Sequence, residues 1–136
     1  MTLALIDLLA IFYQAGDLER MEVIARSMLS AVPNDLVALQ FLALALYLRG
    51  RTEDAYHLFR RYVLLVETPV EAPEHVTTCQ LAAHASYAAA TRPGSGLARG
   101  WFGIARILAR LGYGLHAIRA RQAALTAEGK IATSIP

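Results

Sequence analysis

The chain has 136 residues, of which 56% are hydrophobic and only 18% are charged, and its mean hydropathy is +0.39. This length suits one domain, and so apolar a composition predicts either a wide buried interior or a surface covered by a partner. The single cysteine excludes an internal disulfide framework. No stretch reaches the roughly 18 uncharged apolar residues of a membrane span, and the N-terminus lacks the basic region of a signal peptide, so a cytoplasmic protein is expected.

The net charge of +2 conceals two parts of opposite sign. Residues 1–91 carry 6 Arg and 10 Asp or Glu, a net charge of −4, whereas residues 92–136 carry 7 Lys or Arg and one acid, a net charge of +6. Arg99, Arg106 and Arg110 are spaced by 7 and 4 residues, which places them on one face of a helix. We therefore expect a basic face in the last third of the chain.

An internal repeat organises the first half of the chain. When the sequence is aligned with itself at an offset of 34 residues, eight positions are identical without a gap. These pairs are Ala4/Ala38, Leu5/Leu39, Leu8/Leu42, Tyr13/Tyr47, Gly16/Gly50, Glu19/Glu53, Arg26/Arg60 and Val32/Val66. They predict two copies of one structural unit.

Each unit is predicted to form two helices. In the first unit, one apolar helix face has the i, i+3, i+4, i+7 spacing, formed by Leu5, Leu8, Leu9 and Phe12. Gly16 is predicted to end that helix in the left-handed conformation, and Asp17 to cap the second helix through its side chain. The second helix has an inner face of Met21, Ile24, Ala25, Met28 and Leu29.

The second unit repeats this plan after a turn at Pro33-Asn34-Asp35, where Asp35 is predicted to cap the next helix. The inward residues of that helix are Leu39, Leu42, Ala43 and Leu46. Gly50 is predicted to stop it and Thr52 to cap the helix that follows. Ala55 and Phe59 supply a small and a large residue four apart, which lets two helices cross closely.

The 34-residue period, the Gly between helices, the Ala-x3-Phe of Ala55–Phe59 and Pro33 at the unit end resemble the tetratricopeptide repeat. The resemblance implies an all-α fold: a right-handed superhelical array of antiparallel helix pairs, about seven helices, in a single domain at 1–129. Repeat 1 would cover about 2–35 and repeat 2 about 36–69, with a degenerate third pair and cap at about 74–128 and a tail at 130–136.

The second half predicts a helix from about 74 to 91, a loop at 92–96, a helix at about 97–111 and a last helix at about 115–128. Two registers fit these elements. In the favoured one, 74–111 forms the third pair and the last helix is a cap, because a stacked array alternates its helices. In the other, 98–128 is the third repeat, with family-like residues at Trp101, Ile104, Leu108, Gly112, Ala117, Ala124 and Leu125, and the helix before it is an insertion.

The family resemblance also implies an inner groove lined by the first helix of each pair. The implied partner-binding residues are Leu3, Ile6, Ala10, Tyr13, Gln14, Val37, Gln40, Leu44, Tyr47 and Leu48. This set is mostly apolar, so the expected function is a scaffold or chaperone-like module that holds an apolar peptide or helix of a protein partner. The carboxylate clamp of some family members is not expected, because Ile6, Ala10 and Phe41 stand at its positions.

Two other readings stay open. The apolar strip is also typical of a homodimer seam or of plain helix packing. The basic face of Arg99, Arg106 and Arg110 would line the groove in the second register and lie outside in the first, and it suits an acidic surface better than a nucleic acid.

No pattern predicts catalysis, so an enzyme, a metal site or a cofactor is not expected. His75 and Cys79 are four residues apart on one expected helix, but His84 would lie about 180° around that helix from His75, so a four-ligand zinc site is not expected there. The Arg92–Gly96 segment lacks the Gly-Lys-Ser/Thr ending of a phosphate-binding loop and reads as a connector.

Overall fold

The computed structural model describes residues 2–68, 81 and 84–130, and every regular element in these ranges is helical. The helices with defined bounds are α1 (Thr2–Gln14), α2 (Leu18–Ala31), α3 (Leu36–Leu48), α4 (Thr52–Glu67), α6 (Ala98–Arg110) and α7 (Gly114–Ala127). Residues 84–91 are helical as well. The predicted all-α class is therefore confirmed. Within the described ranges no helix has the length and apolarity needed to span a membrane.

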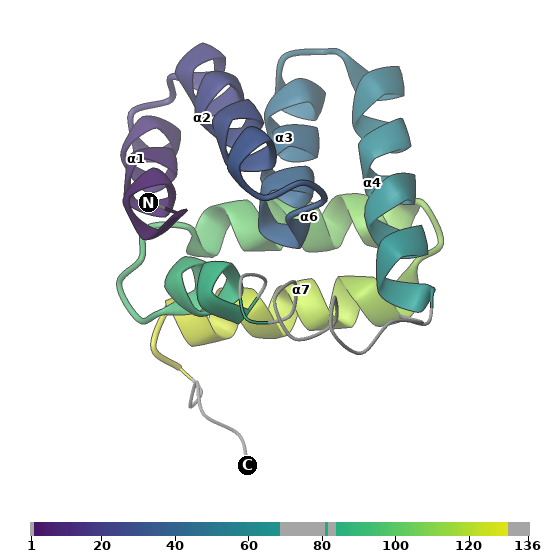
Figure 1. The fold of residues 1–136 in the computed structure, drawn as a ribbon. Helices are drawn as coiled ribbons and strands as arrows, with labels where there is room; N and C mark the ends of the chain where they lie inside the picture. The colour runs from purple at the N-terminus through teal and green to yellow at the C-terminus, as the bar shows by residue number, and fades with distance from the viewer. Residues whose placement is uncertain (1, 69–80, 82–83, 131–136) are drawn as a thin grey trace.

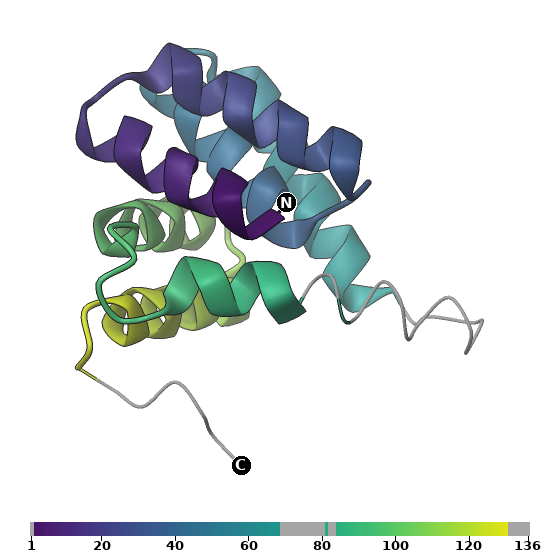
Figure 2. The same ribbon diagram turned by 60° about the vertical axis from the view of Figure 1, so that its left-hand side comes forward.

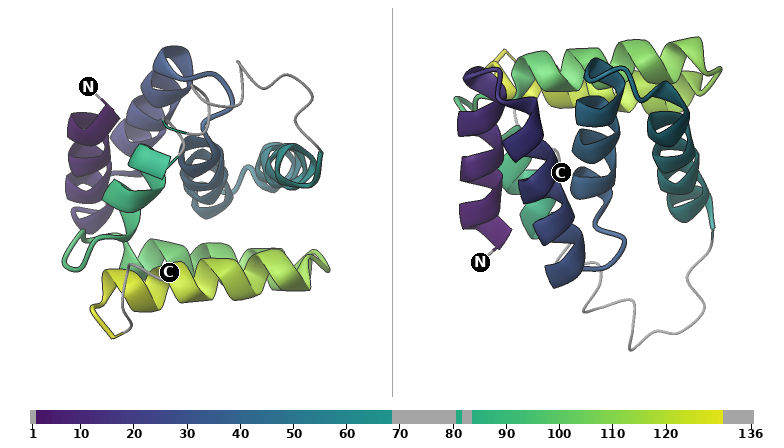
Figure 3. Two further views of the ribbon diagram at one scale, coloured as in Figure 1. Left: turned by 60° about the horizontal axis from the view of Figure 1, so that its bottom comes forward. Right: turned by 90° about the horizontal axis from the view of Figure 1, so that it is seen from above.

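The helices form three hairpins, α1–α2, α3–α4 and α6–α7, and α3 contacts both α2 and α6. The first two hairpins lie side by side, whereas α6 and α7 run across them (Figures 1 and 3). Helix α3 lies between its neighbours, and its residues 37–46 are all buried. The sequence of α3, LVALQFLALALYL, is apolar on every face of the helix. Such a helix is stable only where it is covered on every side, as α3 is here.

The turn inside each hairpin has the same geometry. Its glycine, which is Gly16, Gly50 or Gly112, has a positive φ of 74°, 84° or 86°. The glycine N–H donates to the carbonyl three residues earlier, and the next N–H donates to the carbonyl five residues earlier, at 2.9–3.1 Å. This is a helix-ending motif that glycine adopts without steric cost. The shared turn and the pairing of α6 with α7 favour the register in which 98–128 is the third unit.

Of the three helix caps predicted from the sequence, two are present in the structure. The Asp17 carboxylate accepts from Arg20 N at 3.1 Å, and the Asp35 carboxylate accepts from Val37 N at 2.9 Å and Ala38 N at 3.1 Å. The prediction for Thr52 is wrong, because Thr52 is already the first residue of α4 and no side chain caps that helix. The acidic first turn of α4 favours its N-terminus instead.

Burial raises the pKa of Asp35 above its ordinary value of 3.8, although the N–H of Ala38, the Ser86 hydroxyl and the N–H of Val37 oppose the shift. The folded protein thus holds this proton more tightly than the unfolded chain. We expect wild type to lose stability relative to Asp35→Asn as the pH rises from 3.8 through the raised pKa. Urea unfolding of both proteins over a pH series measures this difference, and a difference that grows in favour of wild type with pH would contradict it.

The segment 84–97 lies on the inner side of the molecule, between α1 and α7 (Figure 2). Ser86 Oγ donates to Asp35 Oδ1 at 3.2 Å, and Arg92 forms an ion pair with Asp7 of α1. Gly94 N donates to Ala127 O at the end of α7, at 2.9 Å. The segment therefore joins the first hairpin, the start of α3 and the last hairpin.

One residue of the expected inner face of α1 is exposed. Leu9 is fully buried, and Leu5 and Phe12 are partly buried, but the exposed fraction of Leu8 is 38%. The described part of the chain therefore leaves the side of α1 on which Leu8 lies partly uncovered.

Candidate partner-binding crevice

Much of the groove implied by the family resemblance is filled by the protein's own chain. Five of the expected groove residues are at most 6% exposed: Ile6, Ala10, Val37, Gln40 and Leu44. The chain's own later segments lie against two of them, because a Cβ at Gly96 would meet Ala10 and one at Gly100 would meet Leu44. The side chain of Leu3 lies outside the described part. In this conformation these five residues pack in the interior, and Leu44 also borders a small hollow between α3 and α6.

Gln40 is a buried polar residue whose hydrogen-bond partner lies in its own helix. Its Nε2 donates to Leu36 O of its own helix at 3.0 Å. With Tyr62, Tyr87 and Trp101 among its neighbours it lines a small hollow of about 230 Å³. Burial in this region raises the pKa of Tyr62 to about 12. Gln40 is therefore an interior residue with a local partner.

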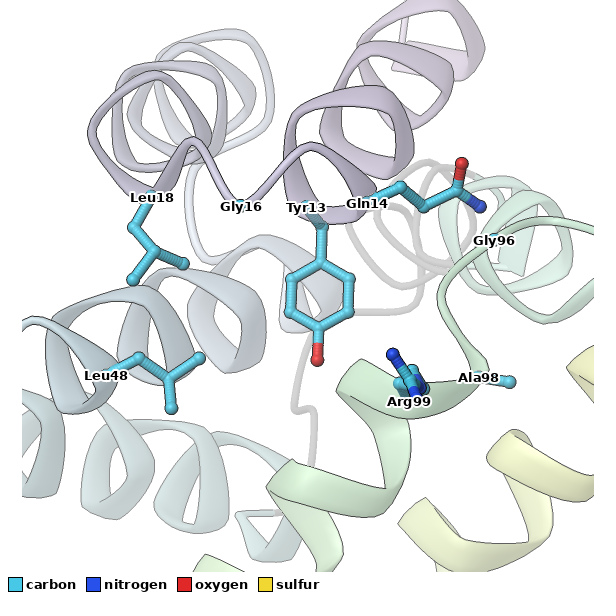
Figure 4. Close-up of a pocket in the computed structure, with 8 residues that line it drawn as sticks. All are labelled: Tyr13, Gln14, Gly16, Leu18, Leu48, Gly96, Ala98 and Arg99. Carbon is cyan, nitrogen blue, oxygen red and sulfur yellow. The ribbon is translucent and has the colours of Figure 1, made fainter.

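The C-terminal ends of α1 and α3 remain open. There, a hollow of about 550 Å³ lies between the first hairpin and the start of α6. Figure 4 shows the Tyr13 side chain reaching from α1 toward Arg99 of α6, with Leu18 and Leu48 on one side and Gln14 and Gly96 on the other. Three expected groove residues, Tyr13, Gln14 and Leu48, thus meet one residue of the expected basic face.

A second hollow of about 130 Å³ continues between α3 and α6. Leu48 lines both hollows, and Arg106 and Arg110 line the second one together with Tyr47. Arg110 Nη1 donates to the Tyr47 hydroxyl at 3.1 Å. We call the two hollows together the arginine crevice, because all three residues of the expected basic face line it. Of the two registers, this placement agrees with the second.

The arginine crevice combines apolar surface with uncompensated positive charge. Leu48 is 49% exposed, and the three arginines are also exposed. None of the three forms an ion pair with another residue in the described ranges. Burial raises the pKa of Tyr13, while the Arg99 guanidinium opposes the shift, so Tyr13 stays a neutral hydrogen-bonding group at pH 7. Such a surface suits a ligand with an apolar anchor and carboxylates.

Sequence reasoning did not assign several lining residues to the groove or the basic face: Gly16, Leu18, Gly96, Ala98, Gly103 and Ile107. Gly96 has a φ of 84°, and a Cβ at this position would lie 2.3 Å from Gln14 Nε2. The glycine-rich character of 92–96 signalled a close backbone approach, but the sequence does not tell which helix end it approaches. Gly96 therefore helps to form the hollow by letting Gln14 lie against the backbone.

The described titratable residues contain no group of three or more that could hold a metal ion. His75 and Cys79 lie outside the described residues. His116 is buried in α7, and its Nε2 lies 3.1 Å from Glu67 Oε1 at the end of α4. This pair connects the last hairpin to the second one, away from the arginine crevice.

Comparison of the chain with protein-family models, with curated proteins and with solved structures gives no match.

Proposed function

We propose that this chain is a tetratricopeptide-type interaction module with a right-handed superhelical arrangement of its hairpins, and that it binds another protein without catalysing a reaction. The 34-residue period and the shared turn geometry at Gly16, Gly50 and Gly112 support this assignment. The third hairpin runs across the first two, and the intervening segment 84–97 fills much of the inner side. The binding surface is accordingly the arginine crevice at the edge of the inner side.

One observation carries the proposal: three arginines without ion-pair partners in the described ranges line the same open crevice as Tyr13 and Leu48. Arginine forms bidentate bonds with carboxylates, and Tyr and Arg contribute strongly at protein interfaces. At 1.5 Å per residue, the spacings of 7 and 4 residues on α6 correspond to about 10 Å and 6 Å. A partner helix with acidic residues at matching spacings and a leucine anchor would fit.

A nucleic-acid ligand is the second candidate, since the same arginines could contact phosphates. Trp101 is unavailable for stacking on bases, because it is 1% exposed and its Nε1 donates to Ala90 O at 2.9 Å. Phe102 is half-buried. The two aromatic side chains that line the crevice, Tyr13 and Tyr47, are partly buried, so an acidic protein segment is the better match.

Two helix-forming peptides test the proposal, one with a leucine anchor and glutamates spaced by 4 and 7 residues, the other with glutamines in their place. We expect the glutamate peptide to bind at least about tenfold more tightly, measured by fluorescence anisotropy. Arg99→Gln should weaken the binding of the glutamate peptide only, and Leu48→Ala should weaken both. Arg60→Gln, which removes an exposed arginine of α4 outside the crevice, should change neither.

Equal binding of the two peptides, or undiminished binding by Arg99→Gln, would contradict the acidic-segment proposal. A single-stranded DNA probe separates the second candidate. Binding of DNA tighter than that of the peptide, with a steep loss of affinity as salt rises, would favour a nucleic acid.

A further inference from the structure

The last hairpin has an open groove on its surface. A hollow of about 610 Å³ lies between α6 and α7. It is lined by Phe102, Ala105, Arg106, Ala109, Gly114, Ala117, Ile118 and Arg121. Ile118 is 57% exposed. We call this hollow the hairpin groove; its apolar floor and arginine rim lack a covering element in the described part of the chain.

The opposite end of the array has an exposed apolar strip on α1. At the 34-residue offset, the residues Ala4, Leu8 and Ile11 of this strip correspond to Ala38, Leu42 and Ala45 of α3. In α3, which contacts α2 of the preceding hairpin, these three positions are at most 1% exposed. In α1, Leu8 and Ile11 are 38% and 57% exposed. The strip therefore repeats positions that are buried in α3, and the described part of the chain leaves it open.

The hairpin groove has buried counterparts inside the same chain. Gly112 follows Gly50 by 62 residues, and at that offset Arg106, Ala117 and Arg121 correspond to Leu44, Ala55 and Phe59. These three residues of the second hairpin are at most 2% exposed. In the last hairpin, the two large apolar residues are replaced by arginines, and the surface is open. A covering element for this groove should thus bring both apolar area and negative charge.

The first hairpin supplies that charge. Residues 2–31 contain four acids and two arginines, a net charge of −2. Residues 98–127 contain five arginines and no acid, a net charge of +5. Asp7 lies one residue before Leu8, is exposed at the edge of the α1 strip and also forms the ion pair with Arg92. The two ends of the array are therefore complementary in charge as well as in apolar surface.

We propose that copies of this chain associate head to tail, with the exposed strip of α1 of one copy lying in the hairpin groove of the next. This contact would repeat between copies the way in which a first helix covers the preceding hairpin within the chain. Such a heterologous interface joins two different surfaces, so it produces either closed rings or open chains whose ends can grow. The association does not require a ligand in the arginine crevice, although Arg106 lines both surfaces.

Light scattering on a size-exclusion column tests the association from about 10 μM to about 1 mM, a range that includes weak contacts. Wild type should increase in molar mass with concentration and dissociate as salt rises, because exposed charges are screened. Ile11→Lys and Ile118→Lys should each be monomeric. Leu64→Lys places the same charge on an exposed leucine of α4, 54% exposed, and should associate like wild type.

Mixing the two lysine variants gives the decisive result. The Ile11→Lys protein keeps an intact hairpin groove and the Ile118→Lys protein keeps an intact α1 strip, so an equimolar mixture should form a 1:1 dimer and nothing larger. A monomeric wild type at every concentration would overturn the proposal. A wild-type dimer that persists in Ile118→Lys, with no rescue on mixing, would show a symmetric seam and would also overturn it. Circular dichroism confirms that both variants keep their helices.

Discussion

Replacing Trp101 with alanine is expected to lower the free energy of unfolding by about 3–5 kcal/mol. Trp101 is 1% exposed, and its ring meets Phe41 of α3 edge-on at a centroid distance of 4.9 Å. It also lies 5.9 Å from the Tyr87 ring, and its Nε1 donates to Ala90 O at 2.9 Å. One side chain thus joins α6 to α3 and to helix 84–91, so its loss leaves a cavity where three elements meet.

Urea unfolding followed by far-UV circular dichroism measures this effect, because the substitution removes the only tryptophan. Trp101→Phe is the matched control. It keeps an aromatic ring but removes the N–H donor, and the Ala90 carbonyl still accepts from Ser95 Oγ at 3.2 Å. We expect a cost of about 1–2 kcal/mol for the control. An alanine variant no less stable than the phenylalanine variant would show that the ring does not connect these helices.

Gly100→Val is expected to destabilise the protein by about 1–3 kcal/mol through overpacking, despite the poor helix propensity of glycine. A Cβ at Gly100 would lie 2.6 Å from Phe41 Cε1, a distance that real Cβ atoms do not show. The Phe41 side chain of α3 is fully buried and packs against the Trp101 ring, so it has little space into which to move. The variant should therefore separate α6 from α3 and deform the arginine crevice.

Gly103→Ala provides the comparison on the same helix. Its Cβ would lie 3.2 Å from Leu44 Cδ1, which is the end of a side chain that can shift slightly. Alanine also favours the helix by up to about 1 kcal/mol, so we expect the stability of Gly103→Ala to stay within about 1 kcal/mol of wild type. Equal urea midpoints for the Gly100 and Gly103 variants would contradict the close approach of α6 to Phe41.

The sequence by itself determined the elements that depend on neighbouring residues. Gly16 and Gly50 end their helices because only glycine adopts the left-handed conformation there freely, and Asp17 and Asp35 cap the next helices with their own carboxylates. The expected helices at about 97–111 and 115–128 agree with α6 and α7 within one residue at each end. These interactions join residues at most five positions apart, so they can be predicted from a short stretch of sequence. Thr52 is the exception, since the charged residues Glu53 and Asp54 replace a side-chain cap.

The tertiary structure decided which helices pair and which faces stay open. Gly50 and Gly112 are 62 residues apart, 28 more than the 34-residue period, and this interruption hides the relation of the last hairpin to the first two. The sequence pattern alone left two registers open for α6, because helical periodicity identifies an apolar face but not the helix that covers it. In the structure α6 pairs with α7, while Trp101 contacts Ala90 and Gly100 lies against Phe41 of α3.

The same limit applies to the candidate site. Tyr13 and Leu48 could be selected as inner residues from the repeat, and Arg99, Arg106 and Arg110 as one helix face from their spacing. Only the tertiary structure shows that these two sets line one crevice, while Ile6, Val37 and Gln40 are buried. Residues a few positions apart determine which side of a helix is apolar. Which other helix packs against that side depends on the apolar surface buried by the whole chain.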